Sequence, residues 1–349
     1  MPNKTYPEIR NQYQAIAKTH DYILQHEAAL KDFYARGGFK RLVAIGSGSS
    51  YDLSMAVACS ANLLLSIPAV PIPAGDLMLR TETYAPVLRD ALVLVLSRSG
   101  STDEIVNTIN LLAAMSCNVK VLSIVCVEDS RVSKISDYVL EMPWAFDESV
   151  CQTRSVSTMY AAAQLVLSIF SDNSEIKKDI LTIAEAGDDY FEKTEPLLRE
   201  IAHENWKKVY VLADGEVSGV AEEAALAFNE ICYIPSTCKH LLDLRHGPIV
   251  LVDGETLVIA HVNTDGFDYQ KALIGDVVNK GAKVIVYSDM PLPEQLEGVR
   301  AQIVFGKPLT GSTVAIPMLL IAQLLSYHSA VSRGINPDQP QGLDAWIAL

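Results

Sequence analysis

The sequence of 349 residues lacks an excess of positive charge. Its 28 basic residues are outnumbered by 42 acidic ones, which gives a formal net charge of −14. Proteins that bind nucleic acids normally present a basic face, so this balance argues against a nucleic-acid partner. The net field also repels anions, which means that an anionic ligand must be held by local features of the chain.

Long apolar runs are lacking as well. The first residues, MPNKTYPEIR, contain no apolar segment after the basic residue and do not resemble a signal peptide. The longest apolar stretch, 314–325, is interrupted by Pro317 and Gln323 and is too short to span a bilayer. We expect a buried helix there, no membrane partner and a cytoplasmic location.

Cysteines are few, and their pattern excludes several kinds of site. The six cysteines form no CxxC pair and no Cys/His cluster with the spacing of zinc ligands. Several lie in apolar runs, such as Cys126 in VLSIVC, where a thiol behaves as a small apolar group. We therefore expect reduced thiols, no metal and no cofactor.

Short apolar runs rich in β-branched residues are abundant, and each is followed by a turn and a helical pattern. Such runs are typical of strands in parallel sheets covered by helices on both faces. Four begin at residues 41, 91, 119 and 137, and four more begin at 208, 256, 282 and 301. The two sets have nearly the same spacing, which favours a duplicated α/β unit, although ordinary α/β proteins also show such intervals.

The predicted fold is therefore α/β, with two tandem doubly wound domains, each a mostly parallel sheet flanked by helices. We place the first domain at 1–190 and the second at 191–349, joined through the charged helical stretch 171–208. One or two amphipathic helices should precede the first strand and end at Gly37 and Gly38.

Two loops have the composition of an anion site. The strand that begins at residue 41 runs into GSGSSY (46–51), and the one that begins at 91 runs into SRSGSTDE (97–104). Glycines let the backbone approach a ligand, hydroxyls can donate to phosphate oxygens, and each loop opens a predicted helix. One such loop alone is more often a turn or a helix cap, but two at successive strand ends indicate phosphate binding. Neither loop fits the Walker or the dinucleotide pattern.

Candidate proton-transfer groups follow in the second half. Glu223 and Glu230 are seven residues apart on an apolar helical pattern, so both should lie on one face. A carboxylate among apolar side chains has a raised pKa, which suits a base that works near neutrality, although Glu230 could equally face water at the helix end. His246 stands in the turn RHGP, where a histidine can be catalytic or structural.

IGSGSSY followed by LSRSGST resembles the paired phosphate loops of the sugar isomerase (SIS) family, and the resemblance covers nearly the whole chain. The family includes the isomerase half of glucosamine-6-phosphate synthase, the tagatose-6-phosphate ketose/aldose isomerases and the fructosamine-6-phosphate deglycases. SRSG is closer to the tagatose-type isomerases, because the synthase has glutamine between the serines. The resemblance implies a set of residues around the 6-phosphate, where Arg98 can present its backbone N–H and also its charge: Ser49, Ser50, Ser97, Arg98, Ser99 and Thr102.

The resemblance also assigns roles in the second half. NEICYI and LRHGP are similar to the family's KEISYI and LKHGP, which places Glu230 on the carboxylate that moves the proton between C1 and C2. Glu223 matches a family glutamate and is a second candidate base. His246 falls on the ring-opening histidine, which comes from the partner subunit in this family, so a homodimer or a higher oligomer is implied. The segment 149–155 is similar to the one that lines the sugar, where we assign Thr153 and Arg154.

Two departures from the synthase narrow the expected chemistry. The tail NPDQPQGLDAWIAL has no lysine to form an imine with the ketose, and no glutaminase domain precedes the first strand. What remains is a phosphosugar isomerase, an amino-sugar-phosphate deaminase or a deglycase, acting by C1–C2 proton transfer after ring opening. The alternative is a non-catalytic phosphosugar-binding regulator, which would keep the serine loops without needing Glu230 or His246.

Overall fold

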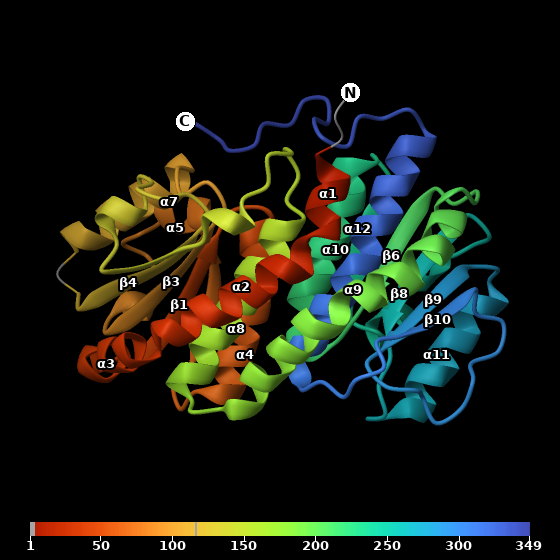
Figure 1. Ribbon diagram of the computed structural model, residues 1–349, viewed down its shortest axis with the longest axis horizontal. Coiled ribbons are helices and arrows are strands. Elements are labelled where there is room, and N and C mark those ends of the chain that lie inside the picture. The colour runs from red at the N-terminus through yellow and green to blue at the C-terminus, as the bar shows by residue number, and fades with distance from the viewer. Residues whose placement is uncertain (1–3, 116) are drawn as a thin grey trace. The chain divides into compact units, whose positions relative to one another are not determined.

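The computed structural model describes residues 4–115 and 117–349 and divides into two compact units (Figure 1). The first unit is the chain up to Glu185 together with Gly342–Leu349, and the second is Ala186–Gln341. Helix α9 (Ser174–Ala202) carries the chain from the first unit into the second.

Each unit alternates strands and helices after its opening helical segment. In the first unit the elements before α9 are α1 (Thr5–Arg10), α2 (Gln12–Gln25), α3 (Glu27–Gly37), β1 (Arg41–Gly46), α4 (Ser49–Leu64), β2 (Ala69–Pro73), α5 (Ala74–Leu79), α6 (Ala85–Leu88), β3 (Ala91–Ser97), α7 (Asp103–Ala114), β4 (Val119–Val125), η1 (Ser133–Ile135), β5 (Tyr138–Glu141), η2 (Pro143–Ala145) and α8 (Arg154–Phe170). In the second unit the elements after α9 are β6 (Lys208–Leu212), η3 (Gly215–Val217), α10 (Ser218–Ile231), β7 (Ser236–Lys239), η4 (Leu242–Arg245), η5 (Pro248–Leu251), β8 (Thr256–His261), α11 (Phe267–Asn279), β9 (Lys283–Ser288), β10 (Ala301–Val304), η6 (Gly311–Val314) and α12 (Ala315–Ser332). The helical segment before the first strand is confirmed, but it consists of three helices and not one or two; as predicted, it ends at Gly37, with Gly38 in the left-handed conformation.

Both sheets are five-stranded and parallel, and they share one strand order. The first sheet runs β2-β1-β3-β4-β5. The second runs β10-β9-β8-β6-β7, which is the same order read from the other edge. The predicted fold class, two doubly wound parallel sheets flanked by helices, is confirmed, and the common order supports a duplication.

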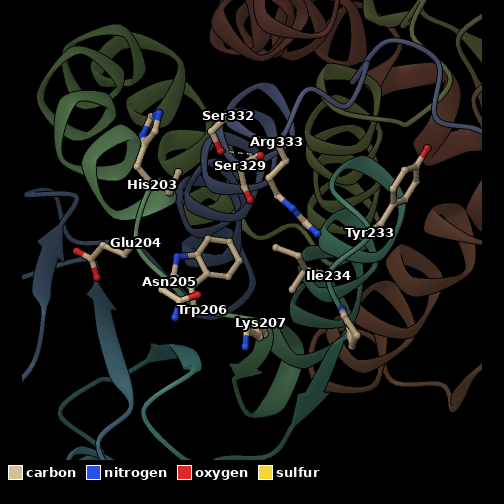
Figure 2. A pocket seen from close by; sticks show the side chains of 12 residues that line it. His203, Glu204, Asn205, Trp206, Lys207, Tyr233, Ile234, Ser329, Ser332 and Arg333 are labelled. Carbon is tan, nitrogen blue, oxygen red and sulfur yellow. Dashed lines mark hydrogen bonds between the residues drawn. The ribbon is translucent and has the colours of Figure 1, made fainter.

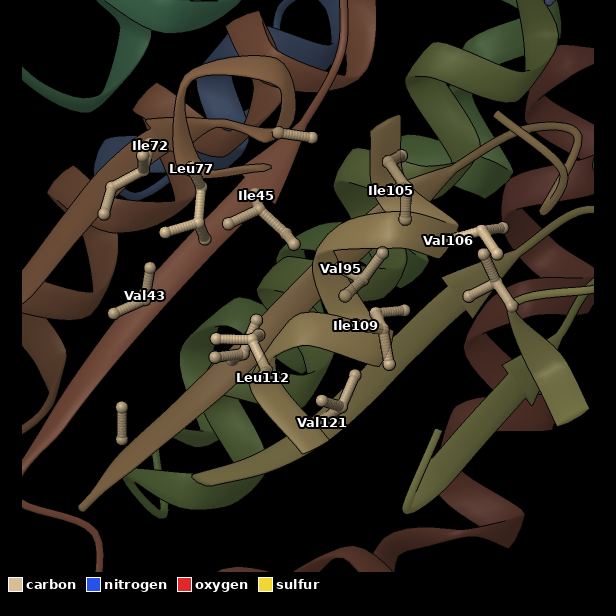
Figure 3. Packing of buried hydrophobic residues seen from close by; sticks show 14 of the residues in the cluster. Val43, Ile45, Ile72, Leu77, Val95, Ile105, Val106, Ile109, Leu112 and Val121 are labelled. Atoms are coloured by element: carbon tan, nitrogen blue, oxygen red, sulfur yellow. The ribbon is translucent and has the colours of Figure 1, made fainter. Parts of the chain in front are cut away.

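The first sheet is buried on both faces, as its continuous apolar strands predict. On one face Val43, Ile45, Val93 and Val95 pack against helices α5, α6 and α7. Figure 3 shows the apolar side chains that α5 and α7 contribute. The alternate residues of the same strands lie on the opposite face, where α4 and α8 contact each other and the strands.

The second sheet has the same construction. Apolar side chains of β6, β8 and β9 pack against Leu273, Ile274 and Val277 of α11. Helix α10 contacts β6 and β7, and it also packs along α12. Together with η6, α12 forms the one helix among the described residues that is long and apolar enough to cross a membrane, and 94% of its most apolar window is buried. The buried helix expected around 314–325 is therefore present.

The two units also repeat a detail of side-chain bonding. Near the end of α4 the amide of Asn62 donates to the carbonyl of Ala69 and accepts its N–H, both at 2.8 Å. Near the end of α10 Asn229 makes the same pair of bonds to Ser236, at 3.2 and 2.9 Å. The two asparagines are 167 positions apart, as are the two residues that they hold. Each asparagine fixes the start of the following edge strand.

These edge strands, β2 and β7, were not predicted. β2 contains Pro71 and Pro73, and proline is tolerated only at sheet edges because it lacks the N–H that a central strand donates. β7 is the short polar sequence STCK, which has no apolar run to mark it. Both lie at the same place in the repeat, next to the first strand of their unit.

Candidate functional site

The two serine-rich loops lie side by side in the first unit. β1 and β3 are neighbours in register, with Ile45 opposite Val95, so their carboxyl ends meet at one edge of the sheet. One loop opens α4 at Ser49 and the other opens α7 at Asp103. This edge is where open parallel sheets bind ligands, and two helix N-termini there favour an anion.

In the second loop, two serine hydroxyl oxygens already accept hydrogen bonds from the backbone. Ser97 Oγ accepts the N–H of Gly100 at 3.1 Å, and Ser99 Oγ accepts the N–H of Ser101 at 3.2 Å. A serine hydroxyl that accepts from the backbone keeps its own proton for donation. Thr102 is the N-cap residue of α7, and its side chain makes no capping bond. The loop thus presents hydroxyl donors beside the N-terminus of a helix.

The first loop contains Ser49, Ser50 and a third serine that the sequence analysis did not assign. The hydroxyl of Ser47 is buried without a hydrogen-bond partner, and such a group costs free energy unless something bonds to it. Ser49 and Ser50 are buried at the first turn of α4. A partnerless hydroxyl beside them is the feature that most directly indicates a ligand here.

Arg98 is oriented differently from a phosphate-binding side chain. Its guanidinium is buried and donates to the carbonyls of Ser149 and Val150 at 3.0 and 2.8 Å, and also to that of Ala345. The side chain therefore ties the loop to segment 146–155 and to the last residues of the chain. From this position Arg98 can offer an anion its backbone N–H, whereas its charge, which the resemblance also offered for the phosphate, is turned toward these carbonyls.

The last residues of the chain also contact the start of α7. The N–H of Asp103 donates to the carbonyl of Ile347 at 3.3 Å, and the N–H of Leu349 donates to the Asp103 carboxylate at 2.7 Å. Arg131 pairs with the same carboxylate and, together with the Leu349 N–H, holds the pKa of Asp103 below its usual value.

Thr153 and Arg154 begin α8, directly after segment 146–152. Thr153 is fully buried, and its N–H donates to the carboxylate of Asp147 at 2.8 Å. Arg154 lies 3.8 Å from the same carboxylate and donates to the carbonyl of Phe146. The backbone bonds of this segment to the Arg98 guanidinium place it in the same unit as the serine loops.

The carboxyl edge of the second sheet has a different chemistry. At the positions 167 residues after Ser47 and Ser49 stand Asp214 and Glu216. Asp214 accepts from the ring of His240 at 3.0 Å. His261 ends β8, and burial lowers its pKa to about 4, so the ring is neutral at pH 7. This edge presents carboxylates where the first presents hydroxyls, and it is unsuited to an anion.

Glu223 and Glu230 both lie on α10, which confirms the predicted helix. Glu223 is buried, whereas Glu230 is half-buried one residue before the helix ends. Burial raises the pKa of their neighbour Glu222, with Lys239 and His240 opposing the shift. Burial on this helix therefore acts to raise the pKa of a carboxyl at Glu222.

His246 lies on a separate exposed segment of the second unit. It follows η4, and its N–H donates to the carbonyl of Asp243 at 2.9 Å. In the next turn Val250 is 75% exposed and Leu251 is 60% exposed, while Leu242 on the preceding turn is also exposed. Apolar side chains grouped around an exposed histidine are typical of a surface that another protein covers.

A cavity of about 560 Å³ lies elsewhere in the second unit, at the amino ends of β6 and β7 (Figure 2). None of the predicted site residues lines it. Figure 2 shows Arg333 extending from the end of α12 toward Ile234, and its guanidinium donates to the carbonyl of Cys232 at 2.6 Å. Because parallel sheets bind ligands at the carboxyl edge, we do not include this cavity in the candidate site.

In the described ranges, 4–115 and 117–349, no group of three His, Cys, Asp or Glu side chains is arranged to hold a metal ion. None of the six cysteines, all of which lie in these ranges, forms a disulfide.

The SIS domain matches this chain twice, over residues 39–169 and 204–332. The chain belongs to the SIS family. Each match spans one of the two sheets, so the duplication seen in the structure is a duplication of this domain.

Comparison with individual proteins extends the likeness over the whole chain. The glutamine–fructose-6-phosphate aminotransferase (isomerizing) of Sulfurisphaera tokodaii is 24% identical over 358 residues, which cover 100% of this chain and 57% of that protein. The chain thus spans about half the length of the curated relatives it matches.

Solved structures show the same fold over their full length. Tagatose-6-phosphate ketose/aldose isomerase from Escherichia coli superposes with a TM-score of 0.85 at 21% identity, covering 99% of this chain and 96% of that one. Glucosamine-6-phosphate deaminase from Thermotoga maritima gives 0.82 at 24% identity, covering 99% and 100%.

Proposed function

We propose that this chain is an enzyme that binds a 6-phosphosugar at the serine loops of the first unit and rearranges its C1–C2 end. The reaction is an aldose–ketose isomerisation, or the deamination or deglycation of an amino-sugar phosphate. The observation that carries the proposal is the row of hydroxyls at the ends of β1 and β3, with Ser97 and Ser99 free to donate and Ser47 buried without a partner. The names of the two solved relatives supply the first two reaction classes.

In this proposal the phosphate accepts hydrogen bonds from Ser50, Ser97, Ser99 and Thr102, with Ser49 beside them. The N-termini of α4 and α7 compensate its charge in a chain that is otherwise acidic. Arg98 contributes its backbone N–H and, through its guanidinium, holds the segment that contains Thr153 and Arg154 against the sugar.

Glu230 is proposed as the base that moves the proton between C1 and C2, with Glu223 as the second candidate on the same helix. His246 is proposed to open the sugar ring in the active site of a partner subunit. Its exposure, and that of the apolar residues around it, supports a homodimer in which this segment is covered. The free thiols suit a reducing cytoplasm.

The binding part is tested by thermal shift and calorimetry with 6-phosphosugars of the glucosamine, galactosamine, tagatose, fructose and fructosamine series. A ligand that binds the native state raises the melting temperature by mass action. We expect stabilisation by phosphorylated compounds alone. Equal stabilisation by the unphosphorylated sugars, or none by any of them, would contradict the phosphosugar assignment.

The catalytic part is tested by Glu230→Gln, with Glu222→Gln on the same helix as the matched control. Loss of a general base costs roughly 10²–10⁴-fold in rate, so E230Q should lose turnover and still bind, while E222Q stays active. Full activity in E230Q would move the role to Glu223. Binding without turnover by the unaltered chain on every substrate would instead favour the regulatory phosphosugar-binding protein.

A further inference from the structure

Helix α1 supplies a buried carboxylate to the segment assigned to the sugar. Glu8 is 5% exposed, and its Oε1 accepts the N–H groups of Glu148 and Ser149 at 2.6 and 3.2 Å. The hydroxyl of Ser149 donates to the other oxygen. Three donors from one short turn thus converge on a side chain that lies about 140 residues earlier in the sequence.

A second buried carboxylate holds the other end of the same segment. Asp147 is 1% exposed and accepts the N–H groups of Thr153 and Ser155 at 2.8 and 2.9 Å, together with the Ser155 hydroxyl. From the opposite side the Arg98 guanidinium binds the carbonyls of Ser149 and Val150. The backbone of 148–155 is therefore fixed at both ends and joined to the second serine loop.

We propose that Glu8 is a positioning residue, which together with Asp147 fixes segment 148–155 so that Thr153 and Arg154 meet the sugar while the serine loops hold the phosphate. This inference rests on the proposed function. In this proposal Glu8 contacts neither the sugar nor the phosphate, and it acts through the N–H groups of Glu148 and Ser149. Its loss should therefore affect the recognition of the sugar and leave the recognition of the phosphate unchanged.

The protonation of Glu8 gives this arrangement a measurable signature. Burial and the nearby charge of Asp147 raise the pKa of Glu8 to about 7, against the hydrogen bonds that lower it. Glu8 also lines a cavity of its own in the first unit, and the other charged side chains around that cavity are Lys4, Glu148 and Arg154. Lys4 pairs with Glu148 at 2.9 Å. Ser149 Oγ also lies 3.0 Å from the carbonyl of Cys151, so its proton has a second acceptor when Glu8 is protonated.

The test compares Glu8→Ala, Glu8→Gln and the control Glu148→Gln by calorimetry with a 6-phosphosugar and with inorganic phosphate. E8A should bind the phosphosugar about tenfold more weakly, the equivalent of one hydrogen bond, and bind phosphate as the unaltered chain does. E8Q keeps an acceptor for the two N–H groups, so it should restore sugar affinity and remove the pH dependence of that affinity around pH 7. E148Q should change neither.

Hydrogen exchange of the peptide 146–157 provides a readout that needs no ligand and applies to any variant that folds. Faster exchange in E8A and native exchange in E8Q would support the positioning role. Unchanged exchange in E8A, or an equal loss of phosphosugar and phosphate affinity, would overturn it. If the unaltered chain bound phosphate and no phosphosugar, the proposed function would fail, and the sugar role of Glu8 with it, whatever the exchange showed.

Discussion

The first and second SIS repeats place opposite chemistry on nearly the same backbone. Both sheets have one strand order, both carry the asparagine that holds the edge strand, and Gly48 and Gly215, at equivalent positions, both have a positive φ (55° and 58°). The loop around Gly48 carries hydroxyls, however, whereas the loop around Gly215 carries Asp214 and Glu216. The few residues after each strand, and not the shared architecture, therefore set the charge of this edge in each repeat.

The largest effect is expected from giving the first repeat the acidic residue of the second. Ser47→Asp introduces the side chain that stands at the equivalent position 214, next to the proposed phosphate. Like charges at close range should lower phosphosugar affinity by more than 100-fold, or about 3 kcal/mol, measured by calorimetry. Ser47→Ala is the matched control and should cost at most tenfold. An S47D variant that binds normally would show that the anion lies elsewhere.

The next largest effect concerns the distance between the end of the first strand and the first turn of the helix after it, which we compare between the two repeats. A Cβ added at Gly46 would lie 2.3 Å from the backbone of Ser50, whereas the equivalent residue of the second repeat is Ala213 and already carries one. Gly46→Ala must push the first turn of α4 away, so we expect a loss of roughly 3 kcal/mol in stability and of phosphosugar binding.

The variant for comparison in the second repeat is Gly215→Ala, which lies at the position equivalent to Gly48. A Cβ there meets nothing within 4 Å, and only its positive φ of 58° opposes the substitution. We expect a cost of about 1 kcal/mol, measured by denaturation with hydrogen exchange in each unit. Equal losses in G46A and G215A would contradict the tighter approach in the first repeat.

The sequence alone predicted those strands and loops that depend on a local pattern of residues. All eight predicted strands exist, and the central ones are runs rich in β-branched residues that are buried on both faces. β2 and β7 were missed because an edge strand requires little apolar sequence. The serine loops were found from composition, but the partnerless hydroxyl of Ser47 and the turn of Arg98 toward Ser149 depend on distant contacts. Glu8 was assigned no role from the sequence, because nothing local marks its partners, which lie about 140 residues later.

The two units should also respond to pH in opposite directions. Glu8 has a folded pKa of about 7 against a usual 4.5, so its contribution is present below pH 4.5 and is lost as pH rises through 7. His261 has a folded pKa of about 4 against 6.5, so the second unit gains stability as pH rises from 4 to 6.5. Each shift corresponds to at most about 3 kcal/mol.

Hydrogen exchange at pH 5 and pH 7.5 measures this difference unit by unit. The first unit should be relatively more protected at pH 5 and the second at pH 7.5. Glu8→Gln should flatten the response of the first unit and His261→Asn that of the second, each without changing the other. The same pH response in both units would show that the two buried groups do not control it.

The smallest effect tests whether the repeats are energetically alike where their geometry agrees. Asn62→Ala and Asn229→Ala each remove a pair of bonds to the first residue of an edge strand, in one case β2 and in the other β7. Both asparagines are exposed, so each substitution should cost only about 1 kcal/mol, seen as faster exchange in the edge strand of its own unit. Clearly unequal costs would show that one repeat depends on these asparagine hydrogen bonds more than the other.

The N62A variant also tests the proposed phosphate loop from a distance. Asn62 lies near the end of α4, the helix that begins with Ser49 and Ser50. The phosphosugar affinity of N62A therefore reports whether this loop is held from the far end of α4 or by its own turn alone. We expect unchanged affinity, since the loop bonds of Ser97, Ser99 and Gly48 lie wholly at the carboxyl edge.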